Sequence, residues 1–279
     1  MLAERPDAVI LAGGTDLMVD VNEGRRRIHP DELVVCVSRI PELSSWTLDR
    51  AARRLRVGAA VTYAELAAPP LAGLVPALGQ AARTVGSPQI RNAATIGGNI
   101  ATCSPAGDGL PVLAAVEATV ELVSGDGVRD LPIGELMLGV KRTGLRPGEL
   151  ITAITVPLLE GWQGYAKVGV RNAMVIAISG ACLAVDVPSR SVRLALASVA
   201  PTIVRATAAE AFVVEAVDWS AGEIPARAVA EFGRLAATAS TPIDDHRSTA
   251  AYRRHSIDVL ARRLLRRAFM VAGAEQVPA

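Results

Sequence analysis

The first 54 residues alternate short apolar runs with polar and glycine-containing breaks. The apolar runs at 8–11 and 33–37 have the length of short strands, and the periodic segment 16–22 between them predicts a helix that ends before Gly24. Strands that flank a helix in this way indicate a small α/β lobe at residues 1–54.

Over residues 55–157 the spacing of apolar residues changes several times between that of a strand and that of a helix. This pattern predicts a second lobe of mixed structure. Alternation of apolar and polar residues over 54–61 indicates a strand. Thr62 and Glu65 directly after it form a capping-box pattern that opens a helix. The other elements expected in this lobe are helices at 75–84 and near 111–116, a hairpin around 124–127 and a strand at 149–156.

Proline and glycine residues at 157–161 separate two strand-like runs and mark a domain boundary. The elements expected beyond it are an antiparallel meander at 165–170, 175–187 and 192–200, followed by helices near 208–216, 225–239 and 249–271. The predicted fold class is α+β. A two-lobed domain at 1–157 precedes a C-terminal domain at 162–279 that combines antiparallel sheet and helices.

The composition is that of a folded protein without a polyanionic partner. Of 279 residues, 51% are hydrophobic and 20% are charged, which is typical of a globular chain. The net charge is +1 and basic residues are interspersed with acidic ones, so neither nucleic acid nor an anionic membrane is an expected partner. No apolar run reaches the roughly 18 residues that span a bilayer, and no leader-like segment opens the sequence, so we expect a cytoplasmic protein.

The cysteines of the chain are Cys36, Cys103 and Cys182, and none of them lies in a Cys-x-x-Cys pair. This spacing argues against a disulfide framework, a zinc site and an iron–sulfur cluster in this chain. We expect Cys36 and Cys182, which lie in apolar runs, to be core thiols, and Cys103 to be a small packing residue.

Two glycine pairs are the candidate functional motifs. They read Ala12-Gly13-Gly14-Thr15-Asp16-Leu17 and Thr95-Ile96-Gly97-Gly98-Asn99. Adjacent glycines let successive backbone N–H groups turn towards an anion, so two such turns predict a diphosphate held from both sides. Either pair taken alone is more often a plain chain reversal. Neither has the spacing of a Rossmann dinucleotide fingerprint or a P-loop, which disfavours an NAD fold and a nucleoside triphosphatase.

The glycine pairs belong to longer segments that resemble a known family. The segments 11–17, 87–99, 102–108 and 244–254 together resemble the FAD-binding medium subunit of molybdenum hydroxylases, the family that includes xanthine dehydrogenase. The resemblance implies a two-lobed FAD-binding domain of the vanillyl-alcohol-oxidase-like type. It also implies an electron-transfer role: electrons would arrive from [2Fe-2S] clusters on a small partner subunit, which receives them from a molybdopterin large subunit. NAD or another acceptor would then take the electrons. This chain and its two partner subunits would form a heterotrimer, and two heterotrimers would form a dimer.

The same resemblance assigns roles to individual residues. The backbone of residues 12–17 would hold the flavin diphosphate, and residues 95–99 would close its other side. Thr15 and Thr102 would donate hydroxyl hydrogen bonds, and Asp108 would accept one from a ribityl or ring group, although Asp108 is also placed to cap a following helix.

The isoalloxazine ring would lie against Leu150 and Ile151, which the pattern alone would place in a strand core. Lys167 would lie near the pyrimidine edge of the ring, where a cation favours the anionic reduced flavin. No catalytic residue and no metal ligand is expected in this chain.

Some positions depart from the family pattern. The family normally carries a strand and most of a helix before the position of Leu2, which this sequence does not contain. Val175 stands where an aspartate is common, which leaves the final electron acceptor open, and Thr15-Asp16 replaces the His-Ser of carbon monoxide dehydrogenases. Two alternatives stay open: a self-contained FAD oxidoreductase, although no histidine lies in the flavin motifs, and a flavin-free structural subunit.

Overall fold

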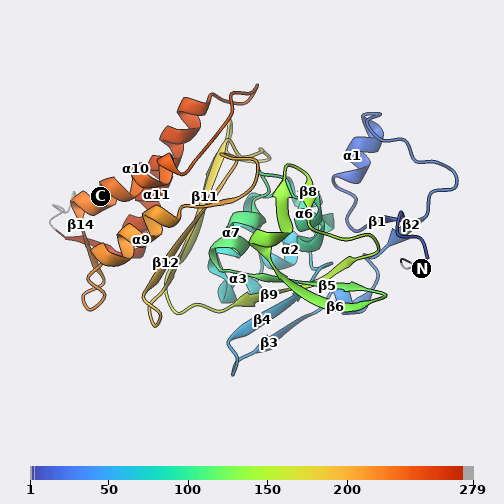
Figure 1. Cartoon of the computed structure of the whole chain (residues 1–279), viewed down its shortest axis with the longest axis horizontal. Helices are drawn as coiled ribbons and strands as arrows, with labels where there is room; N and C mark the ends of the chain where they lie inside the picture. Colours follow the sequence, from blue (N-terminus) through green and yellow to red (C-terminus); the bar gives the residue numbers. More distant parts are fainter. Residues whose placement is uncertain (1, 3, 273–279) are drawn as a thin grey trace.

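The structure, a computed structural model, describes residue 2 and residues 4–272 of the chain. The chain runs from a small N-terminal lobe at one end, through a central domain of sheet and helices, to a C-terminal domain at the other end (Figure 1). Within the described residues, no helix combines the length and the apolar character needed to cross a membrane.

The N-terminal lobe is a two-stranded parallel sheet with one short helix. β1 (Val9–Leu11) pairs with β2 (Val34–Cys36), and α1 (Leu17–Asn22) lies between them in the sequence, as the apolar pattern predicted. Alternate residues of β2 face solvent, and Cys36 is one of them. The prediction that Cys36 is a core thiol is therefore wrong, because this face of the strand is not covered.

The central domain is built on an antiparallel sheet of five strands. Their order in the sheet is β3 (Trp46–Asp49), β4 (Arg54–Gly58), β9 (Leu150–Pro157), β5 (Thr119–Ser124) and β6 (Gly127–Pro132). The connections contribute the short elements η1 (Pro41–Leu43), α8 (Ile133–Leu136), β7 (Met137–Gly139) and β8 (Arg142–Thr143). The predicted hairpin around 124–127 is the turn between β5 and β6.

Six short helices pack in the central domain. They are α2 (Tyr63–Leu66), α3 (Leu71–Leu74), α4 (Pro76–Thr84), α5 (Pro88–Ala93), α6 (Ile96–Thr102) and α7 (Gly109–Ala115). The capping box predicted at Thr62 and Glu65 is present at the start of α2. Every residue of α7 is buried.

The C-terminal domain carries an antiparallel four-stranded sheet with helices on one face. The strands are β10 (Gln163–Val168), β11 (Ser179–Asp186), β12 (Ser191–Ala197) and β13 (Val204–Arg205), in that order. The helices are α9 (Thr207–Ala216), α10 (Ala226–Thr238) and α11 (Ala250–Ala268), and β14 (Glu223–Pro225) pairs in parallel with β15 (Met270–Ala272). α9 contacts β12 and α11 contacts β11.

The central helices lie between the two sheets. α4 contacts β10, and α7 contacts β11 and β12, while α6 contacts β9 of the other sheet. One hydrophobic cluster accordingly includes Leu113 of α7, Ile154 of β9 and Cys182 of β11, which is fully buried as expected. This shared core fixes the position of the C-terminal sheet relative to the central domain.

Several elements differ from those expected. The second glycine pair lies inside α6 and not in a turn, because Thr95 caps a helix that contains both glycines. The strand expected from residue 175 begins only at Ser179, since residues 169–178 form a loop, and the last helix ends at Ala268. Residues 273–279 of the predicted C-terminal domain lie outside the described residues.

Candidate functional site

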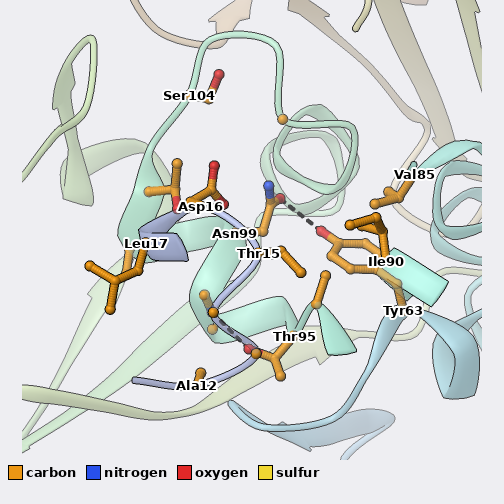
Figure 2. Close-up of a pocket in the computed structure, with 18 of the residues that line it drawn as sticks. Ala12, Thr15, Asp16, Leu17, Tyr63, Val85, Ile90, Thr95, Asn99 and Ser104 are labelled. Atoms are coloured by element: carbon orange, nitrogen blue, oxygen red, sulfur yellow. Dashed lines mark hydrogen bonds between the residues drawn. The ribbon is translucent and has the colours of Figure 1, made fainter. Parts of the chain in front are cut away.

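A cavity of about 760 Å³ lies where the N-terminal lobe, the central domain and one loop of the C-terminal domain meet. Its walls come from the loop 12–17, the N-terminal half of α6, the start of β9 and residues 174–176. Figure 2 places Asp16 and Leu17 on one side of this space and Tyr63, Val85 and Ile90 on the other. The cavity is thus assembled from segments that are far apart in the sequence.

The loop 12–17 presents unpaired amide donors. No described residue accepts a hydrogen bond from the backbone N–H groups of residues 13–17. Gly14 has φ +69°, a left-handed conformation that favours glycine, and it turns the chain between β1 and α1. Consecutive free amides in a turn form an anion-binding concavity. The amides of this loop are thus available to an anion, as the nest predicted for the first glycine pair requires, and the nest itself stays a prediction.

The second glycine pair has a different structural role. The backbone N–H of Ile96 donates to the Val61 oxygen at 3.1 Å, and that of Gly97 donates to the Ala59 oxygen at 2.9 Å. The N–H of Gly98 donates to Thr95 Oγ1 at 3.1 Å (Figure 2). These amides are already satisfied, so the second nest predicted from the sequence is absent.

The glycines of α6 leave room where a side chain would meet a neighbouring segment or enter the cavity. A Cβ on Gly97 would lie 2.6 Å from the Ala59 Cβ, so glycine is needed for α6 to pack against the end of β4. A Cβ on Gly98 would meet only Thr95 Oγ1, at 3.0 Å, and Gly98 lines the cavity. Gly98 is thus the position where an added side chain would occupy the cavity.

Hydrogen bonds tie the walls together. Thr102 Oγ1 donates to Asp16 Oδ2 at 3.2 Å, which joins the end of α6 to the loop 12–17. The buried Tyr63 hydroxyl donates to Asn99 Oδ1 at 2.7 Å (Figure 2). Burial raises the pKa of Tyr63 well above its usual value, so this hydroxyl stays protonated and keeps the Asn99 amide oriented.

Part of the cavity lining is aliphatic. Leu150 and Ile151 of β9 contribute to it, together with Leu145 and Ile176. Among the described residues that line the cavity there is no lysine, arginine or histidine. A ligand with both an anionic and a flat apolar part would find amide donors and aliphatic surface in the same cavity.

Asp108, which lines the cavity, forms a buried pair with Lys167, which lies behind the cavity wall. Lys167 Nζ donates to Asp108 Oδ2 at 2.6 Å, to the Thr84 oxygen at 3.0 Å and to the Val175 oxygen at 3.1 Å. The Tyr165 hydroxyl donates to Asp108 Oδ1 at 2.7 Å. Burial raises the pKa of Asp108, and the attraction of Lys167 opposes this rise.

This arrangement departs from the expected one. Asp108 stands before α7 but makes no side-chain capping bond, because its oxygens accept from Tyr165 and Lys167. Lys167 does not line the cavity, and all three of its ammonium hydrogens have acceptors. Lys167 therefore contacts the cavity wall through Asp108 and the Val175 oxygen, and it has no free ammonium hydrogen to offer a ligand.

Most of the residues predicted for the site do line the cavity. These are Ala12, Gly13, Gly14, Thr15, Asp16, Leu17, Thr95, Gly97, Gly98, Asn99, Thr102, Asp108, Leu150 and Ile151. Ile96 is 1% exposed and belongs to the core, and Lys167 lies beyond the wall. Tyr63, Glu149 and residues 174–176 were not foreseen, and only the capping box at Thr62 pointed to the position of Tyr63.

Comparison with known proteins identifies the class and then the family. The profile of the FAD binding domain in molybdopterin dehydrogenase matches residues 1–159, and that of the CO dehydrogenase flavoprotein C-terminal domain matches residues 165–268. The chain is thus a flavoprotein subunit of an oxidoreductase. It belongs to the family of FAD-binding medium subunits of molybdenum hydroxylases, as the sequence motifs indicated.

Individual relatives support this membership. The nicotinate dehydrogenase FAD-subunit of Eubacterium barkeri is 32% identical over 66% of this chain and 62% of its own length. The nicotine 6-hydroxylase medium subunit of Paenarthrobacter nicotinovorans is 30% identical over 98% of this chain and 93% of its own. The solved carbon monoxide dehydrogenase from Hydrogenophaga pseudoflava superposes with a TM-score of 0.82, at 30% identity, over 94% of this chain and 89% of that one.

The residues of the cavity fit FAD. The free amides of residues 13–17 suit a diphosphate, and they are needed there because no cationic side chain lines the cavity. Leu150 and Ile151 offer an aliphatic surface for a flat ring, and Gly98, which also lines the cavity, has no side chain to occupy it. In the described part of the chain, no group of histidine, cysteine and acidic residues could hold a metal ion.

Proposed function

We propose that this chain is the FAD-carrying electron-transfer subunit of a molybdenum-containing hydroxylase or dehydrogenase. The loop 13–17 carries the proposal, because it lines the cavity with unpaired amides and no described cationic side chain lines that cavity. Because the chain belongs to the FAD-binding family, we identify the anion that these amides would bind as the diphosphate of FAD. On the same basis we propose that residues 1–157 form a domain of the vanillyl-alcohol-oxidase-like type and residues 162–279 a separate C-terminal domain.

Each wall of the cavity has a part in holding the cofactor. Residues 12–17 would bind the diphosphate, α6 would pack its glycines beneath it, and Leu150 with Ile151 would exclude water from one face of the ring. When bound, FAD can accept two electrons and pass them on singly or as a pair. Thr102 would keep Asp16, and with it the diphosphate loop, in place.

The carboxylates of the cavity support electron transfer over conversion of a substrate. Asp16 accepts from Thr102, and Asp108 accepts from Tyr165 and Lys167. Glu149 accepts two bonds from Arg129, at 2.6 and 2.8 Å, and this contact lowers its pKa. Each carboxylate that lines the cavity in the described part of the chain therefore already accepts at least one hydrogen bond from a neighbouring side chain.

The proposal includes partner chains. Several relatives are medium chains or subunits of larger enzymes, among them the nicotine 6-hydroxylase and carbon monoxide dehydrogenase proteins. We expect a small subunit with [2Fe-2S] clusters as electron donor, a large molybdopterin subunit that oxidises the substrate, and NAD or another acceptor. A dimer of heterotrimers and a cytoplasmic location complete the proposal, and the free thiols of the three cysteines agree with a reducing compartment.

The test compares the chain alone with the chain coexpressed with its candidate small and large partners. The isolated chain should retain FAD after gel filtration, and acid precipitation should release it, because no cysteine or histidine lines the cavity to bind it covalently. Substrates of the complex should bleach the flavin absorbance only when the partners are present. Bleaching in the isolated chain would indicate a self-contained oxidoreductase, and failure to take up FAD would indicate a structural subunit.

A further inference from the structure

A second cavity, of about 600 Å³, lies on the far side of the Asp108–Lys167 pair. The end of α4, the start of α5, the end of β10 and the loop after β10 line it. Gly86, Met174 and Val175 line both cavities, so the two share a thin wall. Nothing in the flavin role described above uses this second space.

The second cavity is basic. Arg83, Arg91 and Arg171 line it beside Lys167, and no aspartate or glutamate does so among the described residues. Most arginines near the domain junction are paired, as Arg129 is with Glu149 and Arg205 with Glu210. None of the three arginines of the cavity has a carboxylate partner in the described part of the chain.

The three guanidinium groups are positioned by backbone carbonyl groups. Arg83 Nη1 donates to the Ala67 oxygen at 3.3 Å, and Arg91 Nη1 donates to the oxygens of Val85 and Gly86 at 3.0 and 3.1 Å. Arg171 donates to the oxygens of Ala173 and Met174 in its own loop. These bonds use only part of the five N–H donors of each group and leave its charge uncompensated.

The remaining donors differ in availability. Lys167 uses its three ammonium hydrogens on Asp108, Thr84 and Val175, so it offers no free donor, and Asp108 balances its charge. The arginines have unused N–H groups, and a guanidinium fork matches the oxygens of a phosphate group in a bidentate manner. We propose that this second cavity binds a phosphate-bearing anion through Arg83, Arg91 and Arg171, beside the flavin site.

The probe for this site is inorganic pyrophosphate, titrated calorimetrically into the FAD-loaded protein so that the diphosphate position of the first cavity is filled. Arg83→Gln, Arg91→Gln and Arg171→Gln should each weaken its binding about tenfold, since a charge-assisted hydrogen bond is lost. Arg263→Gln serves as the matched control, because Arg263 is exposed on α11 and lines neither cavity. Binding should also weaken as sodium chloride is added.

A comparison of ligands shows whether the anion belongs to a nucleotide or is free, and other results would contradict the proposal. Tighter binding of ADP than of pyrophosphate would assign the site to a nucleotide, and equal binding would assign it to a free anion. Absence of pyrophosphate binding, tighter binding of succinate, or equal effects of Arg263→Gln and the cavity variants would overturn it. If the chain bound no FAD, pyrophosphate could also occupy the first cavity, but only binding at the second cavity would weaken in the Arg83, Arg91 and Arg171 variants, because none of the three lines the first.

Discussion

Lys167 and Asp108 form an ion pair with 2.6 Å between Nζ and Oδ2, and each side chain is only 9% exposed. The pair joins β10 of the C-terminal domain to the residue that precedes α7. Lys167 was expected to act on the flavin ring as a nearby cation, but in the structure Asp108 balances its charge at the cavity wall. The contributions of Lys167 and Asp108 to stability and to the redox potential can therefore be tested by separate substitutions.

The stability of the fold should depend on this pair. Lys167→Met leaves Asp108 buried without its counter-ion, which should cost about 3–5 kcal/mol of the free energy of unfolding near neutral pH. The double variant Asp108→Asn/Lys167→Met should recover part of this loss, because it removes the unpaired charge. Urea unfolding of the wild type and both variants measures these differences, and a double variant no more stable than Lys167→Met would contradict the assignment.

The cost of Lys167→Met should depend on pH. Burial raises the pKa of Asp108, so its proton is held more tightly in the folded than in the unfolded state. Stability therefore falls as the pH rises from the unfolded pKa through the higher folded one. Loss of Lys167 raises the folded pKa further, so the gap between wild type and variant should be small near a pH of about 4 and should widen towards neutrality. A gap that stays constant over this range would exclude Asp108 as its cause.

The redox potential of bound FAD should respond to the two partners in opposite directions. Asp108 lines the cavity, so Asp108→Asn removes a negative charge and should raise the two-electron potential, whereas Lys167→Met should lower it. A Coulomb interaction of about 4 kcal/mol at 4 Å and a dielectric constant near 20 sets a ceiling of roughly 90 mV for either shift. Dye-coupled titration of the flavin absorbance measures both. Shifts of the same sign would show that the ring lies elsewhere.

Gly98→Val should abolish FAD retention while the fold survives. The added side chain would extend into the cavity, since Gly98 lines it and, apart from its chain neighbours and the backbone of α6, only Thr95 Oγ1 among the described atoms lies within 4 Å of the Cβ position. Gly134→Val is the matched control, because Gly134 also lies in a short helix and its Cβ position has no neighbour within 4 Å. Far-ultraviolet circular dichroism reports whether the fold survives, and the FAD content after gel filtration reports cofactor retention. A folded Gly98→Val protein with full FAD would show that α6 is not part of the FAD site.

Thr102→Val should weaken FAD binding without a large change in stability. It removes the hydrogen bond from Thr102 Oγ1 to Asp16 that fixes the diphosphate loop, a contribution of about 1 kcal/mol or roughly fivefold in the dissociation constant. Thr238→Val, which removes a bond to the Arg234 oxygen far away in α10, is the control. Flavin fluorescence titration measures the affinity. Equal affinities in the two variants would show that the loop needs no such support.

Cys36 should be the thiol that reacts in the native protein. It is exposed, and a hydrogen bond with Ser38 lowers its pKa, whereas burial raises the pKa of Cys103 and Cys182. Thiolates are the reactive form, so iodoacetamide should label Cys36 first and the other two only in urea. Mass spectrometry of tryptic peptides identifies the labelled residue, with Cys36→Ser as the control. Early labelling of Cys182 would mean that the C-terminal sheet opens readily.

The sequence predicted regular elements well where one local pattern decided them. The apolar runs of β1 and β2 and the capping box of α2 need only neighbouring residues. Helix α6 was missed because two glycines disfavour a helix locally. Its first amides instead find distant acceptors, the oxygens of Val61 and Ala59, which no local pattern reveals.

In the candidate site, too, the features set by neighbouring residues were predicted and those set by distant contacts were not. The loop 12–17 was predicted because glycine spacing and the residues around it carry the signal. Residues 174–176 were not, since they reach the cavity only through the packing of the C-terminal sheet on α4 and α7. The partner of Lys167 was missed for the same reason, because 59 positions separate it from Asp108.

The contribution of residues 174–176 to the cavity has a thermodynamic consequence. These residues belong to the C-terminal domain, and the rest of the flavin cavity belongs to the first part of the chain. A ligand that binds only the docked arrangement stabilises docking by the same free energy that it gains in binding. FAD would then hold the two parts of the chain together, and flavin release on heating would report the separation of the C-terminal sheet.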